Sequence, residues 1–189
     1  MLDKSPKNVI INKVANYGRF KQKNNTEIQC MKINIICVGK LKEKYLKDAI
    51  GEYSKRLSRF CTLNIIELPD EKIPDNPVKS DEERILKAES DRIMKHISPD
   101  DYVFSLCIEG KMLSSELFAS KISDVMIAGK STLDFVIGGS LGLDPIVKQR
   151  SDFKLSFSPM TFPHQLMRVV LLEQIFRVFK INNNEKYHK

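Results

Sequence analysis

Two irregular stretches of the sequence combine residue types that suit ligand binding. The first is IGGSLG at residues 137–142, the richest glycine cluster, which follows an apolar run. Glycines after a parallel strand let the backbone approach a ligand, and ligands bind at the carboxyl ends of such strands. The spacing is not G-x-G-x-x-G, so an ordinary tight turn explains this cluster equally well.

The second stretch is FSPMTFPHQ at residues 157–165, which leads into the last helical pattern. Ser158 and Thr161 supply hydroxyl groups, and the prolines leave some peptide groups outside helix or sheet hydrogen bonding. Such backbone donors and acceptors, beside the apolar side chains of Met160 and Phe162, could grip an adenine. A capped helix start is the alternative interpretation.

The candidates for catalysis lie near the end of the chain. The tail contains Tyr187 and His188, and imidazole is the side chain that titrates nearest to neutral pH. A solvated tail is the default, and entry into a neighbouring subunit's pocket is the alternative. Arg168 lacks a partner four residues away on its helix, so it could face a phosphate, a developing anion or a dimer salt bridge. His164 is expected to be a packing or capping residue.

The elements that must position these residues alternate between strand and helix patterns. Short apolar runs predict strands at 31–39, 61–68, 102–108, 132–139 and 153–158. Apolar residues at helical spacing predict helices at 41–60, 80–97, around 117–126 and at 163–181, with a short helix from Asp144 and Pro145. Ser80 and Glu83 are predicted to form a capping box. Repeated strand–helix–strand units predict an α/β domain, with a mostly parallel sheet and helices on both faces.

The last predicted helix, at residues 163–181, is apolar around almost its whole circumference. A helix of this kind must be buried on two sides, by its own sheet and by a second surface. The economical second surface is another copy of the chain, packed about a twofold axis. We therefore expect a homodimer, and a fully internal helix is the alternative.

Composition limits the class of protein. With 189 residues, 42% of them hydrophobic and 29% charged, the chain suits a single globular domain at 31–189. Residues 1–30 show no stable pattern and are expected to be a flexible extension. No apolar run approaches the roughly 20 residues that span a bilayer, and the first 30 residues lack the apolar middle of a secretory signal. We expect a soluble, cytoplasmic protein.

The net charge and the cysteine and histidine residues indicate less about partners and metal binding than the motifs do. The net charge is +7, of which residues 1–30 contribute +4 and residues 31–189 contribute +3. A weakly basic body suits an RNA partner without demanding one. The four cysteines show no C-x-x-C spacing and are expected to be free thiols, mostly buried. No histidine pairs with a cysteine at zinc-finger spacing, so no metal site is predicted.

Taken together and in order, several long motifs resemble one known family. They are VGKLKEKY (38–45), LCIEG (106–110), FVIGGSLG (135–142), LSFSPMTFP (155–163) and PHQLMRVVLLEQIFRVFKI (163–181), followed by the ending YHK. These motifs resemble the RlmH family, bacterial pseudouridine methyltransferases of large-subunit ribosomal RNA. The resemblance covers residues 31–189. One departure is Asn184, where glycine would be expected, so Asn184 is predicted to take a positive φ, which asparagine tolerates.

The resemblance implies a SPOUT-class fold with a C-terminal trefoil knot, a homodimer and S-adenosylmethionine as cofactor. Matched motif by motif, the cofactor-binding residues would be Leu106, Gly138, Phe157, Ser158, Pro159, Met160, Thr161 and Phe162. The implied reaction is methyl transfer to N3 of a pseudouridine, without a metal. His188, with Tyr187, would act at the other subunit's cofactor, and Arg168 would anchor RNA or stabilise charge.

The modest charge of the body favours an assembled ribosome over naked RNA as the substrate. Two alternatives remain open from the sequence. One is a nonenzymatic RNA-binding or ribosome-binding dimer that keeps the fold, and the other is a nucleotide-dependent oxidoreductase, which the missing G-x-G-x-x-G disfavours.

Overall fold

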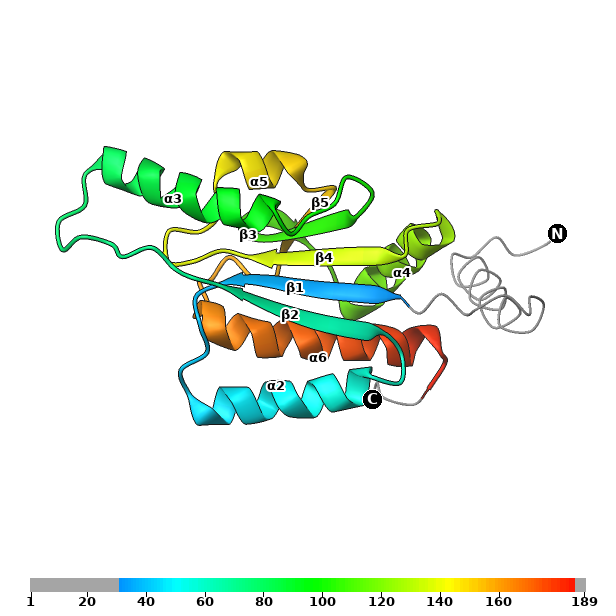
Figure 1. Ribbon diagram of the computed structural model, residues 1–189. Coiled ribbons are helices and arrows are strands. Elements are labelled where there is room, and N and C mark those ends of the chain that lie inside the picture. The colour runs from blue at the N-terminus through cyan, green and yellow to red at the C-terminus, as the bar shows by residue number, and fades with distance from the viewer. Residues whose placement is uncertain (1–30, 186–189) are drawn as a thin grey trace.

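The computed structural model describes residues 31–185. Along the chain the elements are β1 (Lys32–Val38), α2 (Lys44–Leu57), β2 (Thr62–Leu68), α3 (Lys79–Met94), β3 (Tyr102–Met112), α4 (Ser115–Ile127), β4 (Thr132–Ile137), α5 (Pro145–Arg150), β5 (Phe153–Ser156) and α6 (His164–Asn182). The predicted alternation of strands and helices is confirmed (Figure 1). The predicted extension at 1–30 and the tail residues Tyr187 and His188 lie outside the described residues.

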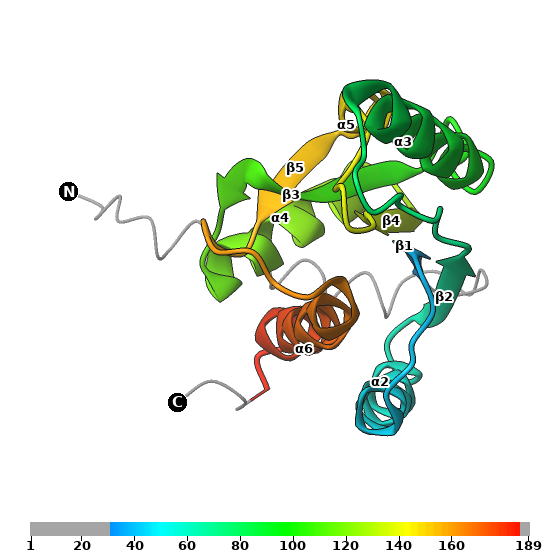
Figure 2. The same ribbon diagram turned by 90° about the vertical axis from the view of Figure 1, so that its left-hand side faces the viewer.

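The strands form one sheet in the order β2-β1-β4-β3-β5, and every neighbouring pair is parallel. Parallel neighbours need crossover connections, which place helices against the faces of the sheet. Helices α2, α4 and α6 contribute to the apolar core on one face, and α3 and α5 to the core on the other. Figures 1 and 2 show this three-layer arrangement. The predicted α/β class, with helices on both faces, is confirmed.

Strand β1 shows why the sheet requires both helix layers. Ile33, Ile35 and Cys37 pack into the core formed with α2, α4 and α6. Ile36 and Val38, at the alternate positions, pack into the core formed with α3 and α5. Successive side chains of a strand point to opposite faces, so a continuous apolar run is buried on both.

Two predicted helix starts are corrected by the structure. Helix α3 begins at Lys79, and the predicted capping box of Ser80 and Glu83 is wrong because the helix starts before Ser80. The carboxylate of Asp81 instead accepts a hydrogen bond from the backbone N–H of Val78, at 3.3 Å. At α6, Pro163 precedes the first helical residue instead of occupying it.

Strand β3 extends beyond the predicted 102–108 and contains an irregularity. Leu106 pairs with Leu155 of β5, and Lys111 pairs with the same residue after a register shift. A Cβ atom on Gly110 would lie 2.7 Å from the carbonyl carbon of Leu155, so only glycine permits this close approach. The extra residues of this bulge lie beside the pocket described below.

Helix α6 is buried mainly on one side. It contacts α2 and α4 and supplies much of the core on that face of the sheet. Leu166 is 39% exposed, and Val169 and Val170 are half-buried, so the alternative of a fully internal helix is wrong. Among the helices of residues 31–185, none is long and apolar enough to cross a membrane.

A chain of polar side chains crosses three strands on the α3 and α5 face. Asn64 donates to Asn34 at 2.9 Å, and Asn34 donates to the carboxyl of Asp134 at 2.7 Å. Asp134 is fully buried. Burial raises the pKa of this carboxyl to about 7, and the negative charge of Asp101 acts in the same direction.

This raised pKa predicts a stability that depends on pH. An unfolded aspartate loses its proton near pH 4, whereas folded Asp134 holds its proton to about pH 7. The contribution of Asp134 to the free energy of unfolding therefore falls between pH 4 and pH 7 and is constant above that. We expect Asp134→Asn to raise the free energy of unfolding relative to wild type, by about 1–3 kcal/mol more at pH 8 than at pH 5. Urea denaturation at both pH values measures this difference, and an equal effect at both would contradict the raised pKa.

Candidate functional site

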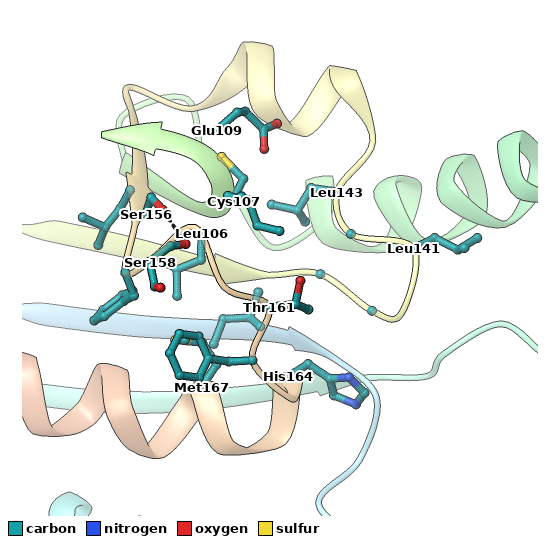
Figure 3. A pocket seen from close by; sticks show the side chains of 18 of the residues that line it. Leu106, Cys107, Glu109, Leu141, Leu143, Ser156, Ser158, Thr161, His164 and Met167 are labelled. Carbon is teal, nitrogen blue, oxygen red and sulfur yellow. Dashed lines mark hydrogen bonds between the residues drawn. The ribbon is translucent and has the colours of Figure 1, made fainter. Parts of the chain in front are cut away.

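The candidate functional site lies where the carboxyl ends of the parallel strands meet. The irregular part of β3, the segments after β4 and β5 and the start of α6 line a pocket of about 400 Å³ (Figure 3). This volume lies within the range of small-molecule sites. An open parallel sheet is expected to bind ligands at this edge because its strand ends converge there.

One wall of the pocket is the glycine turn that follows β4. The backbone N–H of Gly142 donates to the carbonyl of Gly139 at 3.1 Å, and Gly142 has a φ of +83°. A Cβ atom on Gly138 would lie 2.2 Å from the carbonyl oxygen of Gly142. The cluster is therefore a tight turn, as one interpretation of the sequence held, and its backbone also lines the pocket.

The opposite wall is the segment between β5 and α6. The hydroxyl of Ser158 accepts a hydrogen bond from the backbone N–H of Met160 at 3.0 Å, which closes a local turn. The side chain of Met160 is 72% exposed. Seven predicted cofactor-binding residues line the pocket, namely Leu106, Gly138, Phe157, Ser158, Met160, Thr161 and Phe162. Pro159, although described, does not line it.

A charged corner of the pocket was missed by the sequence reasoning. Lys148 of α5 forms an ion pair with Glu109 at 2.6 Å, and this contact lowers the pKa of the Glu109 carboxyl. Cys107 lies beside them, and burial raises the pKa of its thiol. The bulge in β3 carries Cys107 and Glu109, while Lys148 comes from a distant segment. The signal that could have found the first two was their place in the LCIEG motif.

His164 also lines the pocket, although the sequence suggested only packing or capping (Figure 3). A Cβ atom on Gly39 would lie 3.4 Å from Nε2 of this histidine, so the end of β1 lies directly beside the imidazole. Burial lowers the pKa of His164, and the nearby positive charge of Arg168 lowers it further. The neutral imidazole is therefore favoured at this rim of the pocket.

Arg168 is entirely buried, with 0% of its surface exposed. One terminal nitrogen donates to the carboxylate of Glu67 at 2.7 Å. The other donates to the carbonyl oxygens of Val38 at 3.1 Å and Gly39 at 2.8 Å. The expectation that Arg168 contacts RNA is corrected, because this side chain has no surface that RNA could reach. Through these hydrogen bonds Arg168 can position Glu67 and the end of β1.

The loop from β1 to α2 is attached to this buried arginine. Besides the Arg168 contacts, the N–H of Leu41 donates to Glu67 at 2.9 Å. The N–H of Lys42 donates to the side-chain oxygen of Gln165, also at 2.9 Å. Two side chains distant in sequence, Gln165 at the start of α6 and Glu67 near the end of β2, therefore hold this loop beside His164.

The comparisons with known proteins identify the family of this chain. A family model described as "Predicted SPOUT methyltransferase" matches residues 31–188. This chain belongs to the SPOUT methyltransferase family. Three relatives named "Ribosomal RNA large subunit methyltransferase H" come from Clostridium novyi, Bifidobacterium adolescentis and Streptococcus suis, with identities of 60%, 58% and 55%. Each match covers 84% of this chain and 100% of the relative, which confirms the resemblance drawn from the motifs.

The end of α6 confirms one prediction about the C-terminal segment of this SPOUT methyltransferase. Asn184 has a φ of +54°, which confirms the positive φ predicted where glycine was expected. Tyr187 and His188 come three and four residues later and lie outside the described residues. In residues 31–185 no group of three or more histidine, cysteine or carboxylate side chains could hold a metal ion.

The contacts of Arg168 predict a test of its positioning role in this SPOUT methyltransferase. Arg168→Lys keeps the charge but removes the fork that reaches Glu67 and two carbonyls together. We expect a loss of about 2–4 kcal/mol in the free energy of unfolding, and faster hydrogen exchange at the amides of Leu41 and Lys42.

The matched control is Arg84→Lys, which alters a solvent-accessible pair with Asp81 on α3. Exposed pairs three or four residues apart contribute about 0.5 kcal/mol or less. Equal destabilisation by the two substitutions, measured by urea denaturation, would show that the buried contacts of Arg168 have no special role.

Proposed function

We propose that this protein transfers a methyl group from S-adenosylmethionine to N3 of a pseudouridine in bacterial large-subunit ribosomal RNA. The observation that carries the proposal is the pocket at the carboxyl edge of the sheet. Its two main walls are the motifs through which the sequence resembles the RlmH family. The names of relatives 55–60% identical over their whole length support ribosomal RNA as the substrate class.

The residues of the pocket fit S-adenosylmethionine in size and chemistry. Gly138 permits the tight turn, because a Cβ atom there would collide with the carbonyl of Gly142, and the backbone of this turn lines the pocket. Leu106 and residues 157–162 offer apolar side chains and hydroxyls, and the turn at Ser158 directs backbone groups along the same wall. We propose that these residues hold the cofactor and that Pro159, between Ser158 and Met160, shapes the same wall without lining the pocket. When bound, S-adenosylmethionine supplies an activated methyl group on a sulfonium.

The target nitrogen must lose its proton before it can accept the methyl group. N3 of pseudouridine lies in an imide and carries a proton, so it is a poor nucleophile until that proton is removed. A positioned base, or a group that stabilises the resulting anion, lowers this barrier. Alignment of the nitrogen with the methyl group supplies much of the remaining acceleration. We assign the contact with the nucleotide to His188 and Tyr187, with Arg168 as a positioning residue.

The length of α6 supports action of this tail on a second subunit. His164, the first residue of α6, lines the pocket, whereas Asn182 ends the helix about 27 Å away at 1.5 Å per residue. His188 is the sixth residue after Asn182, and an extended chain of six residues spans about 20 Å at most. The chain therefore leaves α6 far from the pocket that His164 lines, which supports the proposal that the tail acts in a homodimer with a shared site.

The exposed side of α6 supplies a surface for such a dimer. Leu166 is partly exposed and Val169 and Val170 are half-buried. A second copy that covers this side would complete the burial of an otherwise apolar helix. The proposal includes the trefoil knot that the resemblance implies for the C-terminal segment. A ribosomal substrate also places the reaction in the cytoplasm.

The first test uses purified protein, radiolabelled S-adenosylmethionine and ribosomes that lack the modification. We expect the label in a methylpseudouridine after digestion of the ribosomal RNA. We also expect intact ribosomes to be methylated better than a short isolated hairpin, because a body charge of +3 binds naked RNA weakly. Identification of the labelled nucleoside by chromatography and mass spectrometry is the measurement.

Two comparisons sharpen this test. His188→Ala should still bind S-adenosylmethionine but lose most of the methyl transfer, and normal transfer would exclude His188 from the reaction. Cofactor binding by the wild type without label in any ribosomal nucleoside would favour the alternative of a nonenzymatic RNA-binding or ribosome-binding dimer.

The glycine turn gives a separate prediction for the cofactor. Gly138→Ala should weaken S-adenosylmethionine binding at least tenfold, because the new methyl group collides with the carbonyl of Gly142 and opens the turn. Gly51→Ala is the matched control, since a Cβ atom there meets nothing within 4 Å and the site is inside α2. Isothermal titration calorimetry measures both, and wild-type affinity in Gly138→Ala would exclude the turn from the cofactor site.

A further inference from the structure

The loop after β1 presents a concentration of positive charge at the rim of the pocket. Residues 40–47, LysLeuLysGluLysTyrLeuLys, carry a net charge of +3. Residues 31–189 as a whole also carry +3, so the remainder of this body is neutral overall. Lys40, Lys42 and Lys44 are exposed, and no ion pair with another residue of 31–185 holds any of them.

An exposed aromatic ring lies within the same segment. Tyr45 is 66% exposed, although it directly precedes Leu46, which is buried in the core. A large aromatic side chain beside unpaired lysines is the combination that single-stranded nucleic acid recognises, because phosphates bind the cations and bases stack on the ring. The packing of α2 does not depend on the exposed ring and hydroxyl of Tyr45.

The backbone of this segment is held by hydrogen bonds to β2, to the start of α6 and to the buried Arg168. The N–H of Gly39 donates to the carbonyl of Leu68 at 2.8 Å, and Arg168 binds the carbonyl of Gly39. The N–H groups of Leu41 and Lys42 are held by Glu67 and Gln165. Gly39 is buried and Leu41 half-buried, whereas Lys40 and Lys42 point outward. The lysines therefore project from a preorganised backbone, which reduces the entropy lost on binding.

The position of the segment connects it to the pocket. Gly39 lies against the imidazole of His164, which lines the pocket, and Gln165, the next residue, binds the N–H of Lys42. In Figure 1 the chain leaving β1 and the start of α6 lie at the same end of the molecule. Figure 3 shows His164 at the edge of the pocket beside the chain that leaves β1.

We infer that residues 40–45 form an RNA-docking ridge, in which Lys40, Lys42 and Lys44 bind phosphates and Tyr45 stacks on an unpaired base of the substrate strand. The ridge orients the RNA strand whose target base enters the pocket. The inference rests on the proposed function for the identity of the substrate. Binding of the ridge to RNA is nevertheless measurable without methyl transfer.

The test compares two full-length triple variants with equal charge change. The first replaces Lys40, Lys42 and Lys44 with glutamine. The second, a control, replaces Lys55, Lys87 and Lys95 with glutamine; these are exposed residues at the far end of α2, on α3 and directly after α3. Binding to large-subunit ribosomal RNA is measured over a series of salt concentrations, and S-adenosylmethionine affinity is measured for each variant.

We expect the ridge variant to bind RNA at least tenfold more weakly, with a salt slope (log affinity against log salt concentration) smaller by about 2, as for the loss of three phosphate contacts. The control should lose less than threefold. Tyr45→Ala should weaken binding about tenfold without changing the salt slope, and Tyr45→Phe should restore it because stacking needs only the ring. Cofactor affinity should be unchanged in all variants.

Activity on ribosomes separates this inference from the proposed function. If the protein methylates ribosomal RNA, the ridge variant should raise KM for ribosomes while kcat stays within about twofold. Methylation with identical KM in the ridge and control variants would overturn the ridge and leave the proposed function standing. RNA binding that depends on the ridge, without any methylation, would support the ridge and overturn the proposed function. A change of oligomeric state in the ridge variant, measured by light scattering, would instead identify this surface as a contact between copies and overturn the inference.

Discussion

The hydrogen bonds of the buried Arg168 guanidinium hold together the carboxyl edge of the sheet, where the pocket lies. A charge removed from water is costly unless it is paired and hydrogen-bonded. Here the guanidinium finds Glu67 of β2 and two carbonyls at the end of β1, so three elements must keep one relative position. Its own helix begins one turn earlier at His164, which lines the pocket. Any displacement of α6 therefore leaves a buried charge without partners.

Glycine has two different uses around the same site. Gly138 and Gly110 are required by space, because a Cβ atom would collide with backbone carbonyl groups of the glycine turn and of β5. Gly39 is required by conformation, since its φ is +87° where β1 ends. Together they let the chain turn sharply after β1 and β4 and bulge in β3. These irregular segments supply pocket walls that regular strands could not form.

The polar groups of the sheet are distributed between its two ends. Asn64, Asn34 and Asp134 form hydrogen bonds across three strands near their amino ends. The carboxyl ends are instead occupied by the loops of the pocket and by the Arg168 contacts. One end of the sheet therefore fixes strand pairing through a buried network, while the other exposes backbone groups to a ligand. The anchored loop after β1 belongs to that second end.

The sequence by itself determined the succession of elements and the two motif walls of the pocket. Strands buried on both faces are continuous apolar runs, and amphipathic helices repeat every three to four residues, so both patterns are local. Only the tertiary structure decided the surroundings of Arg168, His164, Lys148 and Glu67, because their partners lie in other elements of the fold. The helical pattern placed Arg168 on α6 but could not show that β1 and β2 enclose it. Pairing between distant segments is set by how the layers pack, and no local periodicity encodes it.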